Sequence, residues 1–279
     1  MRSRLAFLLL SISFLTAQRR DPPAPSYSAD TIVNAASGVP DSYCPYGLLT
    51  IHGKDLALTS NAVDFPNVNT LPVALANTGT RVLVHNRPIG LLTVSPQEIV
   101  ALLPPDLPVG VSTLQILVNA LAGPAIPIVV RAATPALFLQ AEGVAALTNN
   151  QTDENITMDN PAPPGSEVVL FATGLGAMRP SPVGFTLLKR TAPVVNPVDV
   201  ELDGVPVPAD AILYAGLQPG LAGQYQIKFR VPMGVSDFPT VRLHSAGMFS
   251  QEGIRLPIRT TPPPATEEVA PIAVRFAGR

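Results

Sequence analysis

Proline recurs along the whole sequence and restricts the chain to folds with many turns. The 279 residues include 32 Pro and 20 Gly, spread between short apolar runs rather than gathered in one cluster. A proline inside a helix removes a backbone hydrogen bond and costs about 3 kcal/mol. The pattern therefore excludes a mostly helical chain and is typical of turns between short strands. We expect an all-β protein.

The apolar runs predict strands in both halves of the chain. In the first half the expected strands are residues 48–52, 81–85, 91–94, 99–103, 114–118 and 126–130. In the second half they are residues 168–173, 198–202, 205–207, 211–215, 224–231, 240–244 and 253–258. Asp203-Gly204 is a strong signal for a hairpin turn. Many short strands with turn residues between them favour β-sandwiches.

The two halves also resemble each other. Residues 45–57 (PYGLLTIHGKDLA) align with residues 164–177 (PGSEVVLFATGLGA), and residues 81–110 align with residues 199–235. This repeat is far longer than the roughly 20–50 residues of a solenoid unit, so it indicates domain duplication. The sequence predicts two tandem immunoglobulin-like β-sandwich domains, at residues 29–135 and 136–260.

The N-terminal residues predict export. Arg2 and Arg4 precede an apolar run at residues 5–15, and Ala17 provides a small residue for cleavage. This order is typical of a secretory signal peptide, which we place at residues 1–17. A membrane anchor needs about 20 apolar residues, and charged residues follow too soon. We expect a secreted protein, located outside the cell, at the cell surface or in the periplasm, without a transmembrane anchor in the mature chain.

Pro-rich segments flank the predicted domains. Residues 18–28 form a leader, and residues 261–279 form a tail that we expect to dock in part through residues 272–276. The net charge is −2 and no basic stripe is present, which argues against a nucleic-acid partner. Cys44 is the single cysteine, so an intramolecular disulfide is impossible, and we expect a partly buried apolar role for it.

Gly174-Leu175-Gly176 follows a predicted strand, as the first glycines of a dinucleotide-binding loop do. That loop needs a further glycine or alanine and the start of a helix, but Arg179 stands at that position and Pro180 follows it. Residues 47–55 depart in a similar way from a phosphate-binding loop. We interpret both as strand-end turns, with positive φ at Gly174 and Gly176, and we predict no cofactor.

The acidic residues of one loop could form a catalytic or a metal-binding site. Glu142, Asp153, Glu154 and Asp159 could supply the paired carboxylates of a glycosidase, or Asp153 and Asp159 could form a weak calcium site. Charges in a polar loop are ordinarily only solvated, so we predict neither catalytic residues nor an enzyme. The chain has no Trp, which weakens a sugar-stacking interpretation. The loop at the expected domain junction, together with the glycine turn, is our candidate interaction surface, with the residues Asn149, Asn155, Asn160, Gly174, Gly176 and Arg179.

Several motifs resemble one family. They are residues 33–37 (VNAAS), 160–165 (NPAPPG), 173–176 (TGLG), 214–226 (YAGLQPGLAGQYQ) and 231–232 (VP). In this order they resemble the paired Ig-like domain at the C-terminal end of many secreted acidobacterial proteins, and each half is similar to IPT/TIG-type domains. The resemblance spans residues 32–258 and implies tandem sandwiches, export and no known catalytic role. Residues 43–47 (YCPYG) depart from the Pro-Gly turn that is usual there.

Taken together, these features predict an exported, non-catalytic protein with a structural or binding role, whose partner is a protein or glycan of the cell envelope. Loops at the ends of a sandwich and exposed strand edges are the usual binding places on such folds. The alternatives are a secreted carbohydrate-active hydrolase and a calcium-stiffened spacer, both of which use the acidic loop.

Overall fold

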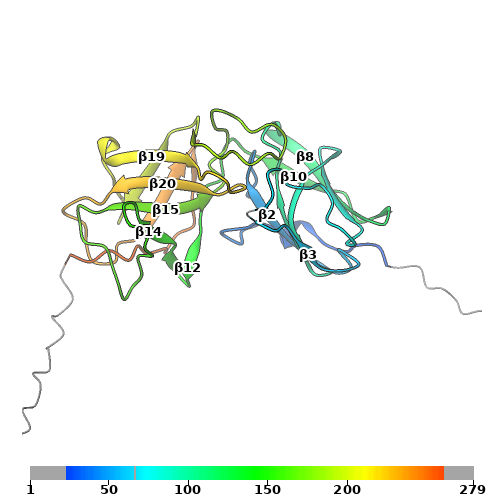
Figure 1. The fold of residues 1–279 in the computed structure, drawn as a ribbon, viewed down its shortest axis with the longest axis horizontal. Coiled ribbons are helices and arrows are strands. Elements are labelled where there is room, and N and C mark those ends of the chain that lie inside the picture. Colours follow the sequence, from blue (N-terminus) through cyan, green and yellow to red (C-terminus); the bar gives the residue numbers. More distant parts are fainter. Residues whose placement is uncertain (1–22, 66, 261–279) are drawn as a thin grey trace, which may run out of the picture.

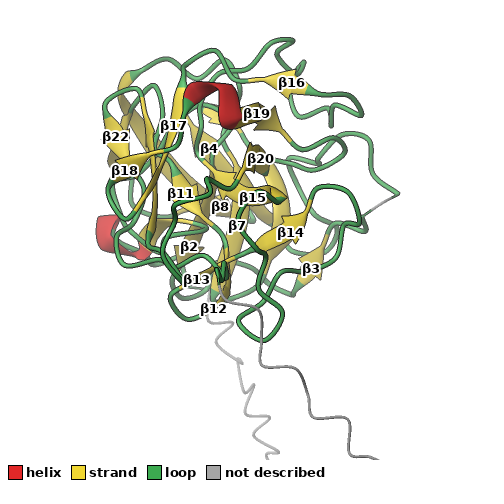
Figure 2. Cartoon of the chain, turned by 90° about the vertical axis from the view of Figure 1, so that its left-hand side faces the viewer, coloured by secondary structure: helices red, strands yellow, loops and turns green. Residues whose placement is uncertain are grey.

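The computed structural model describes residues 23–65 and 67–260, and its regular secondary structure is almost entirely β-strand. Figure 1 shows two sandwiches side by side along the long axis of the molecule. Two short 3-10 turns, η1 (Ala29–Thr31) and η2 (Ala209–Ala211), lie outside the sheets (Figure 2). The predicted signal peptide at residues 1–17 and the tail at residues 261–279 lie outside the described residues.

The first sandwich consists of two antiparallel sheets. One has the order β1-β2-β7-β6-β3, with the strands β1 (Ile32–Asn34), β2 (Leu48–His52), β7 (Glu98–Leu102), β6 (Gly90–Val94) and β3 (Asn61–Ala62). The other has the order β10-β8-β4-β5, and β9 also pairs with β8. Its strands are β10 (Ile126–Val130), β8 (Gly110–Val118), β4 (Thr80–Val84), β5 (Arg87–Pro88) and β9 (Leu121–Ala122).

The second sandwich repeats this plan. Its larger sheet has the order β11-β15-β20-β19-β16, and β14 also pairs with β15. Its strands are β11 (Ala136–Leu137), β15 (Glu167–Thr173), β20 (Tyr225–Arg230), β19 (Ile212–Leu217), β16 (Ala192–Pro193) and β14 (Leu147–Asn149). The facing sheet has the order β18-β17-β21-β22, with the strands β18 (Val205–Pro206), β17 (Val198–Leu202), β21 (Val241–Ser245) and β22 (Met248–Phe249). A separate hairpin joins β12 (Leu139–Ala141) to β13 (Val144–Ala145).

The repeat predicted from the sequence is visible in the sheet order. The run β2-β7-β6 corresponds to β15-β20-β19, and β8-β4-β5 corresponds to β21-β17-β18. Both copies carry a register shift in the corresponding strand, between Leu91 and Thr93 in β6 and between Ile212 and Tyr214 in β19. Such bulges bend a strand and increase its twist. Each half thus has the same Ig-like strand arrangement, and the two halves follow one another in tandem.

The predicted hairpin turn at Asp203-Gly204 is confirmed. Both residues have positive φ, 49° and 75°, between the paired strands β17 and β18. This is the conformation that a two-residue type I′ turn requires. His85-Asn86, with φ of 52° and 58°, occupies the same place between β4 and β5.

The strand predicted at residues 253–258 is wrong. Arg255 makes isolated bridges to Val144 and Thr240, and Ile258 makes one to Ala162, but no ladder forms. Pro257 lacks the N–H that a continuous ladder needs, and Gly253 has a φ of +75°. Ile254, Leu256 and Ile258 are nevertheless buried in the core, so the segment contributes packing instead of strand pairing.

Two apolar clusters form the core. The smaller one lies within the first sandwich. The larger fills the second sandwich and continues into the first through Tyr46, Leu48, Leu71 and Leu102. The two sandwiches therefore share buried apolar surface. None of the helices in the described part of the chain has the length and apolar character needed to cross a membrane.

Candidate functional site

The turn Gly174-Leu175-Gly176 lies at the contact between the two sandwiches. Its glycines have φ of +78° and +80°, so the predicted positive-φ turn is confirmed. A Cβ on Gly174 would lie 2.0 Å from the Thr134 carbonyl oxygen, and one on Gly176 would lie 2.1 Å from that of Ala132. Only glycine permits so close an approach. We call this contact of residues 132–134 with residues 173–176, and the side chains around it, the joint.

Buried hydrogen bonds hold the joint. The Thr173 hydroxyl donates to the Gly223 carbonyl at 2.7 Å and accepts from the Leu48 N–H at 3.3 Å. The Tyr225 hydroxyl donates to the Gly176 carbonyl at 2.7 Å. Tyr225 is fully buried, and this burial, more than the neighbouring Cys44 and Tyr46, holds its pKa well above the usual value. The bond between Leu48 and Thr173 joins the two sandwiches directly, whereas the other two fix the end of β15 and the glycine turn within the second sandwich.

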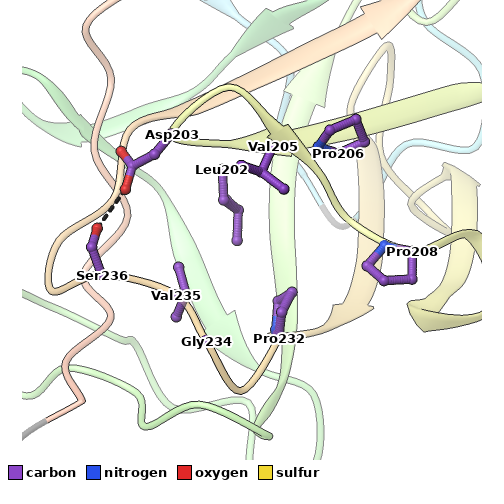
Figure 3. A pocket seen from close by; sticks show the side chains of 9 residues that line it. All are labelled: Leu202, Asp203, Val205, Pro206, Pro208, Pro232, Gly234, Val235 and Ser236. Atoms are coloured by element: carbon purple, nitrogen blue, oxygen red, sulfur yellow. Dashed lines mark hydrogen bonds between the residues drawn. The ribbon is translucent and has the colours of Figure 1, made fainter.

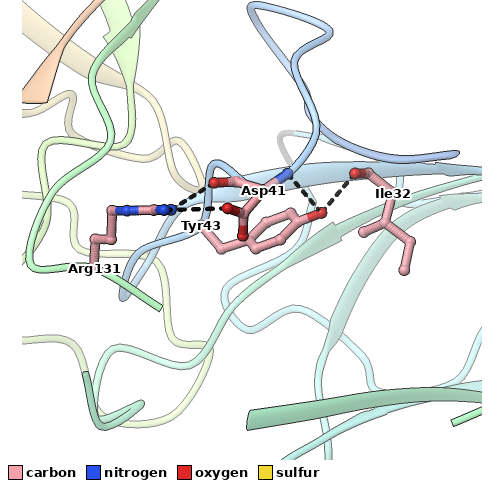
Figure 4. Close-up of polar contacts among 4 residues, drawn as sticks. All are labelled: Ile32, Asp41, Tyr43 and Arg131. Atoms are coloured by element: carbon pink, nitrogen blue, oxygen red, sulfur yellow. Dashed lines mark hydrogen bonds and ion pairs between the residues drawn. The ribbon is translucent and has the colours of Figure 1, made fainter. Parts of the chain in front are cut away.

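The segment that leaves the first sandwich is also anchored, as Figure 4 shows. Arg131 directly follows β10, and its guanidinium donates to the Asp41 carbonyl at 2.6 Å and pairs with the Asp41 carboxylate at 3.1 Å. Tyr43 donates its hydroxyl to the Ile32 carbonyl at 2.6 Å, and the same oxygen accepts from the Asp41 N–H at 3.2 Å. The linker is thus held to the first sandwich just before it reaches the glycine turn.

A second contact links the sandwiches away from the glycine turn. The Leu71 N–H donates to the Phe185 carbonyl at 3.0 Å, and the Leu187 N–H donates to the Asn69 carbonyl at 2.8 Å. The Phe185 ring packs over Gly90, where a Cβ would come within 2.8 Å of it. Two separate contacts restrict rotation about the linker far more than one contact would.

Cys44 is more buried than the sequence indicated. Its side chain has no exposed surface and lies in the joint. Burial raises the pKa of its thiol, and the neighbouring polar groups of Thr134 and the Gly176 backbone only partly oppose this. A thiol in this state is a poor nucleophile, because the reactive thiolate is disfavoured.

Tyr46→Phe is expected to stabilise the protein. The Tyr46 hydroxyl is buried and has no hydrogen-bond partner within the described residues. An unpaired buried hydroxyl costs about 1–3 kcal/mol, so its removal should raise the free energy of unfolding at pH 7 by up to that amount. Chemical denaturation of the two proteins measures the difference, and a loss of stability would contradict the assignment.

The same tyrosine gives a pH dependence. Burial raises the pKa of Tyr46 from 10.0 to about 12. Between these values the unfolded chain loses a proton that the folded chain keeps, so stability falls as the pH rises from 10 to 12. In Tyr46→Phe this decline should be shallower.

The structure does not bring the predicted interaction residues together on one surface. Asn149 pairs with Val168 near the start of β15, whereas Gly174 follows the end of that strand. At about 3.3 Å per residue, β15 separates them by roughly 20 Å. Gly174 and Gly176 are buried in the joint, and Arg179 is exposed beyond it. The expectation that residues 149–160 lie at the domain junction is therefore wrong, because they lie at the outer end of the second sandwich (Figure 1).

The three predicted asparagines do converge at that outer end. They line a hollow of about 160 Å³, which we call the asparagine hollow, formed by Asn149, Glu154, Asn155, Ile156, Asn160, Pro161, Ala162, Pro163 and Ser166. Asn149 shapes its rim, because its side-chain oxygen accepts from the N–H groups of Gln151 and Thr152 at 2.8 and 3.2 Å. The loop is thus a built structure with free polar groups at its surface.

The acidic residues of the sequence prediction lie at the surface. Glu142, Asp153, Glu154 and Asp159 are all exposed. Within residues 23–65 and 67–260, no group of three or more His, Cys, Asp or Glu side chains could hold a metal ion. Solvated carboxylates of this kind match the ordinary behaviour of a polar loop.

A larger hollow opens beside β18, as Figure 3 shows. It has a volume of about 390 Å³ and is lined by Leu202, Asp203, Val205, Pro206, Pro208, Pro232, Gly234, Val235 and Ser236. Asp203 accepts hydrogen bonds from the Ser236 hydroxyl and from the Thr240 N–H and hydroxyl, which lowers its pKa. Its oxygens are therefore engaged within the protein, and the hollow presents mainly an apolar wall.

Comparisons with known proteins found no matching family model and no matching curated protein. Among solved structures, the surface glycan-binding protein PbSGBP-B from Prevotella bryantii is 11% identical, with a TM-score of 0.26 over 81% of this chain and 41% of that one. The mixed-linkage glucan SGBP-B of Bacteroides ovatus is 12% identical, with a TM-score of 0.32 over 87% and 48%. Domains 5–6 of the S-layer protein SbsC are 11% identical, with a TM-score of 0.25 over 85% and 100%.

This chain spans less than half the length of the two glycan-binding proteins. Similarity at these identities and TM-scores does not extend to a function or a ligand. The resemblance to the acidobacterial and IPT/TIG-type domains, with no matching family model, stays a prediction.

Proposed function

We propose that this chain is an exported, non-catalytic protein that binds a protein or glycan of the cell envelope, as a tandem of two Ig-like sandwiches at residues 29–135 and 136–260. The observation that carries the proposal is the asparagine hollow at the outer end of the second sandwich. Loops at the end of a sandwich are where this architecture ordinarily places its recognition residues.

The joint supports this role. Ligand contact at a loop end needs a scaffold that keeps the loop in a fixed position relative to the rest of the chain. The bond between Leu48 and Thr173 across the joint and the second contact at Phe185 provide such a scaffold. No observation on the described residues favours the hydrolase or the calcium-stiffened spacer.

Quantitative retention on envelope fractions tests the proposal. The purified chain, immobilised on a biosensor, is expected to show saturable binding to a detergent extract of the envelope or to its isolated glycans. Binding that does not saturate, or no binding to any fraction, would contradict a binding role. Release of reducing sugar from the same glycans would instead indicate an enzyme.

A further inference from the structure

We propose that the asparagine hollow binds one neutral sugar residue of an envelope glycan. This inference rests on the proposed function and names the ligand class of its site.

The hollow offers hydrogen-bond donors and acceptors that the protein itself does not use. The side-chain amides of Asn155 and Asn160 make no hydrogen bond with other described residues. Asn149 uses only its oxygen, in the turn to Gln151 and Thr152, so its NH₂ group remains available. Asn155 and Asn160 each present both a donor and an acceptor, and Asn149 adds a donor, which is the combination that neighbouring sugar hydroxyls require.

The charge of the hollow selects against anionic ligands. Glu154 is its one ionisable lining residue, and no Lys, Arg or His lines it. A phosphate or sulfate group would meet a carboxylate without a compensating cation. Glu154 accepts one hydrogen bond, from the Thr152 hydroxyl at 3.3 Å, and keeps a second oxygen that can accept from a hydroxyl. A neutral polyhydroxyl ligand fits this set of groups.

The floor of the hollow is apolar. Ile156 and Ala162 are 4% and 6% exposed, and Pro161 and Pro163 lie on either side of Ala162. A pyranose ring has a face of C–H groups that can pack on such a surface while its hydroxyls reach the amides. Polar groups around an apolar floor are typical of small-molecule sites.

The backbone around the hollow argues against an extended peptide. A peptide could bind by adding a strand to the free edge of β14. That edge is already covered, because Thr148 bridges to Asn155 and the Ile156 N–H donates to the Leu147 carbonyl at 2.9 Å. The hydrogen-bonding groups that remain available to a ligand are therefore on side chains and not on the main chain.

The size of the hollow sets the expected affinity. At about 160 Å³ it is smaller than the roughly 300–1,000 Å³ of sites for drug-sized molecules, so it accommodates about one sugar residue. No aromatic ring lines it. For a ligand of this size we expect a dissociation constant of about 1 mM. Useful binding at a surface then depends on many copies of the chain or of the sugar.

Saturation-transfer NMR suits this affinity range. The purified chain is titrated with the methyl glycosides of glucose, galactose, mannose and N-acetylglucosamine, each to about ten times the expected dissociation constant. We expect saturable transfer to at least one of them. In the double variant Asn155→Ala/Asn160→Ala the affinity should fall at least about tenfold. Gln151→Ala is the matched control, since it removes an exposed amide of the same loop that does not line the hollow, and it should bind like the wild type.

The outcomes separate this inference from the proposed function. No transfer to any of the four sugars, or equal binding by the wild type and the double variant, overturns the sugar site. If the double variant also keeps its envelope binding, another surface carries the proposed function, which then survives. If the wild type binds neither sugars nor envelope fractions, both proposals fail.

Discussion

Gly174→Ala is expected to destabilise the protein by about 4 kcal/mol. Alanine at a φ of +78° is strained by about 1–3 kcal/mol, and its Cβ would lie 2.0 Å from the Thr134 carbonyl oxygen, which adds overpacking of similar size. Backbone cannot move aside as a flexible side chain can, so residues 132–134 must shift. Urea denaturation followed by far-UV circular dichroism measures the loss.

Gly220→Ala is the matched control. Gly220 has a φ of +82°, but no atom lies within 4 Å of the position of its Cβ. This variant should lose only the conformational part, about 1–2 kcal/mol. An equal loss of stability in the two variants would mean that the close approach of Gly174 to the Thr134 carbonyl does not contribute to the destabilisation.

Thr173→Val is expected to have the next largest effect, a loss of about 2–4 kcal/mol. Valine keeps the shape but removes the hydroxyl, which leaves the Gly223 carbonyl and the Leu48 N–H buried without this partner. Thr173→Ser keeps the hydroxyl and loses one methyl group, so it should cost about 1 kcal/mol. If chemical denaturation shows Thr173→Ser to be less stable than Thr173→Val, these hydrogen bonds do not stabilise the joint.

Much of the fold could be predicted because its signals are local. The apolar run at residues 48–52 coincides with β2, and Asp203-Gly204 forms the expected turn, since strand alternation and turn chemistry depend on near neighbours. The strand at residues 253–258 failed because Gly253 and Pro257 interrupt a pattern that is otherwise apolar. Strands of two or three residues, such as β13 and β16, are too short to carry any periodicity.

Less of the candidate site than of the fold could be predicted from the sequence. The sequence indicates that Gly174 needs a positive φ, but not that Thr134, forty residues earlier, packs against it. In the same way, polarity predicts that residues 149–160 are exposed, whereas the distance from that loop to the glycine turn depends on the direction of β15 through the sandwich. Pairing between distant segments carries this information, and no local pattern encodes it.

The joint locks the two sandwiches into one unit, and the reactivity of Cys44 is the most direct test of this arrangement. Cys44 is the single cysteine and is fully buried in the joint. The labelling rate with a maleimide is measured for the native chain, for the urea-unfolded chain and for Gly174→Ala.

We expect Cys44 in the native chain to react at least about 100-fold more slowly than in the unfolded chain, because labelling requires the joint to open. Gly174→Ala should raise the native rate at least about tenfold, whereas Gly220→Ala should change it little. Labelling of the native wild type at the rate of the unfolded chain would show that the sandwiches separate freely and that the joint does not lock them.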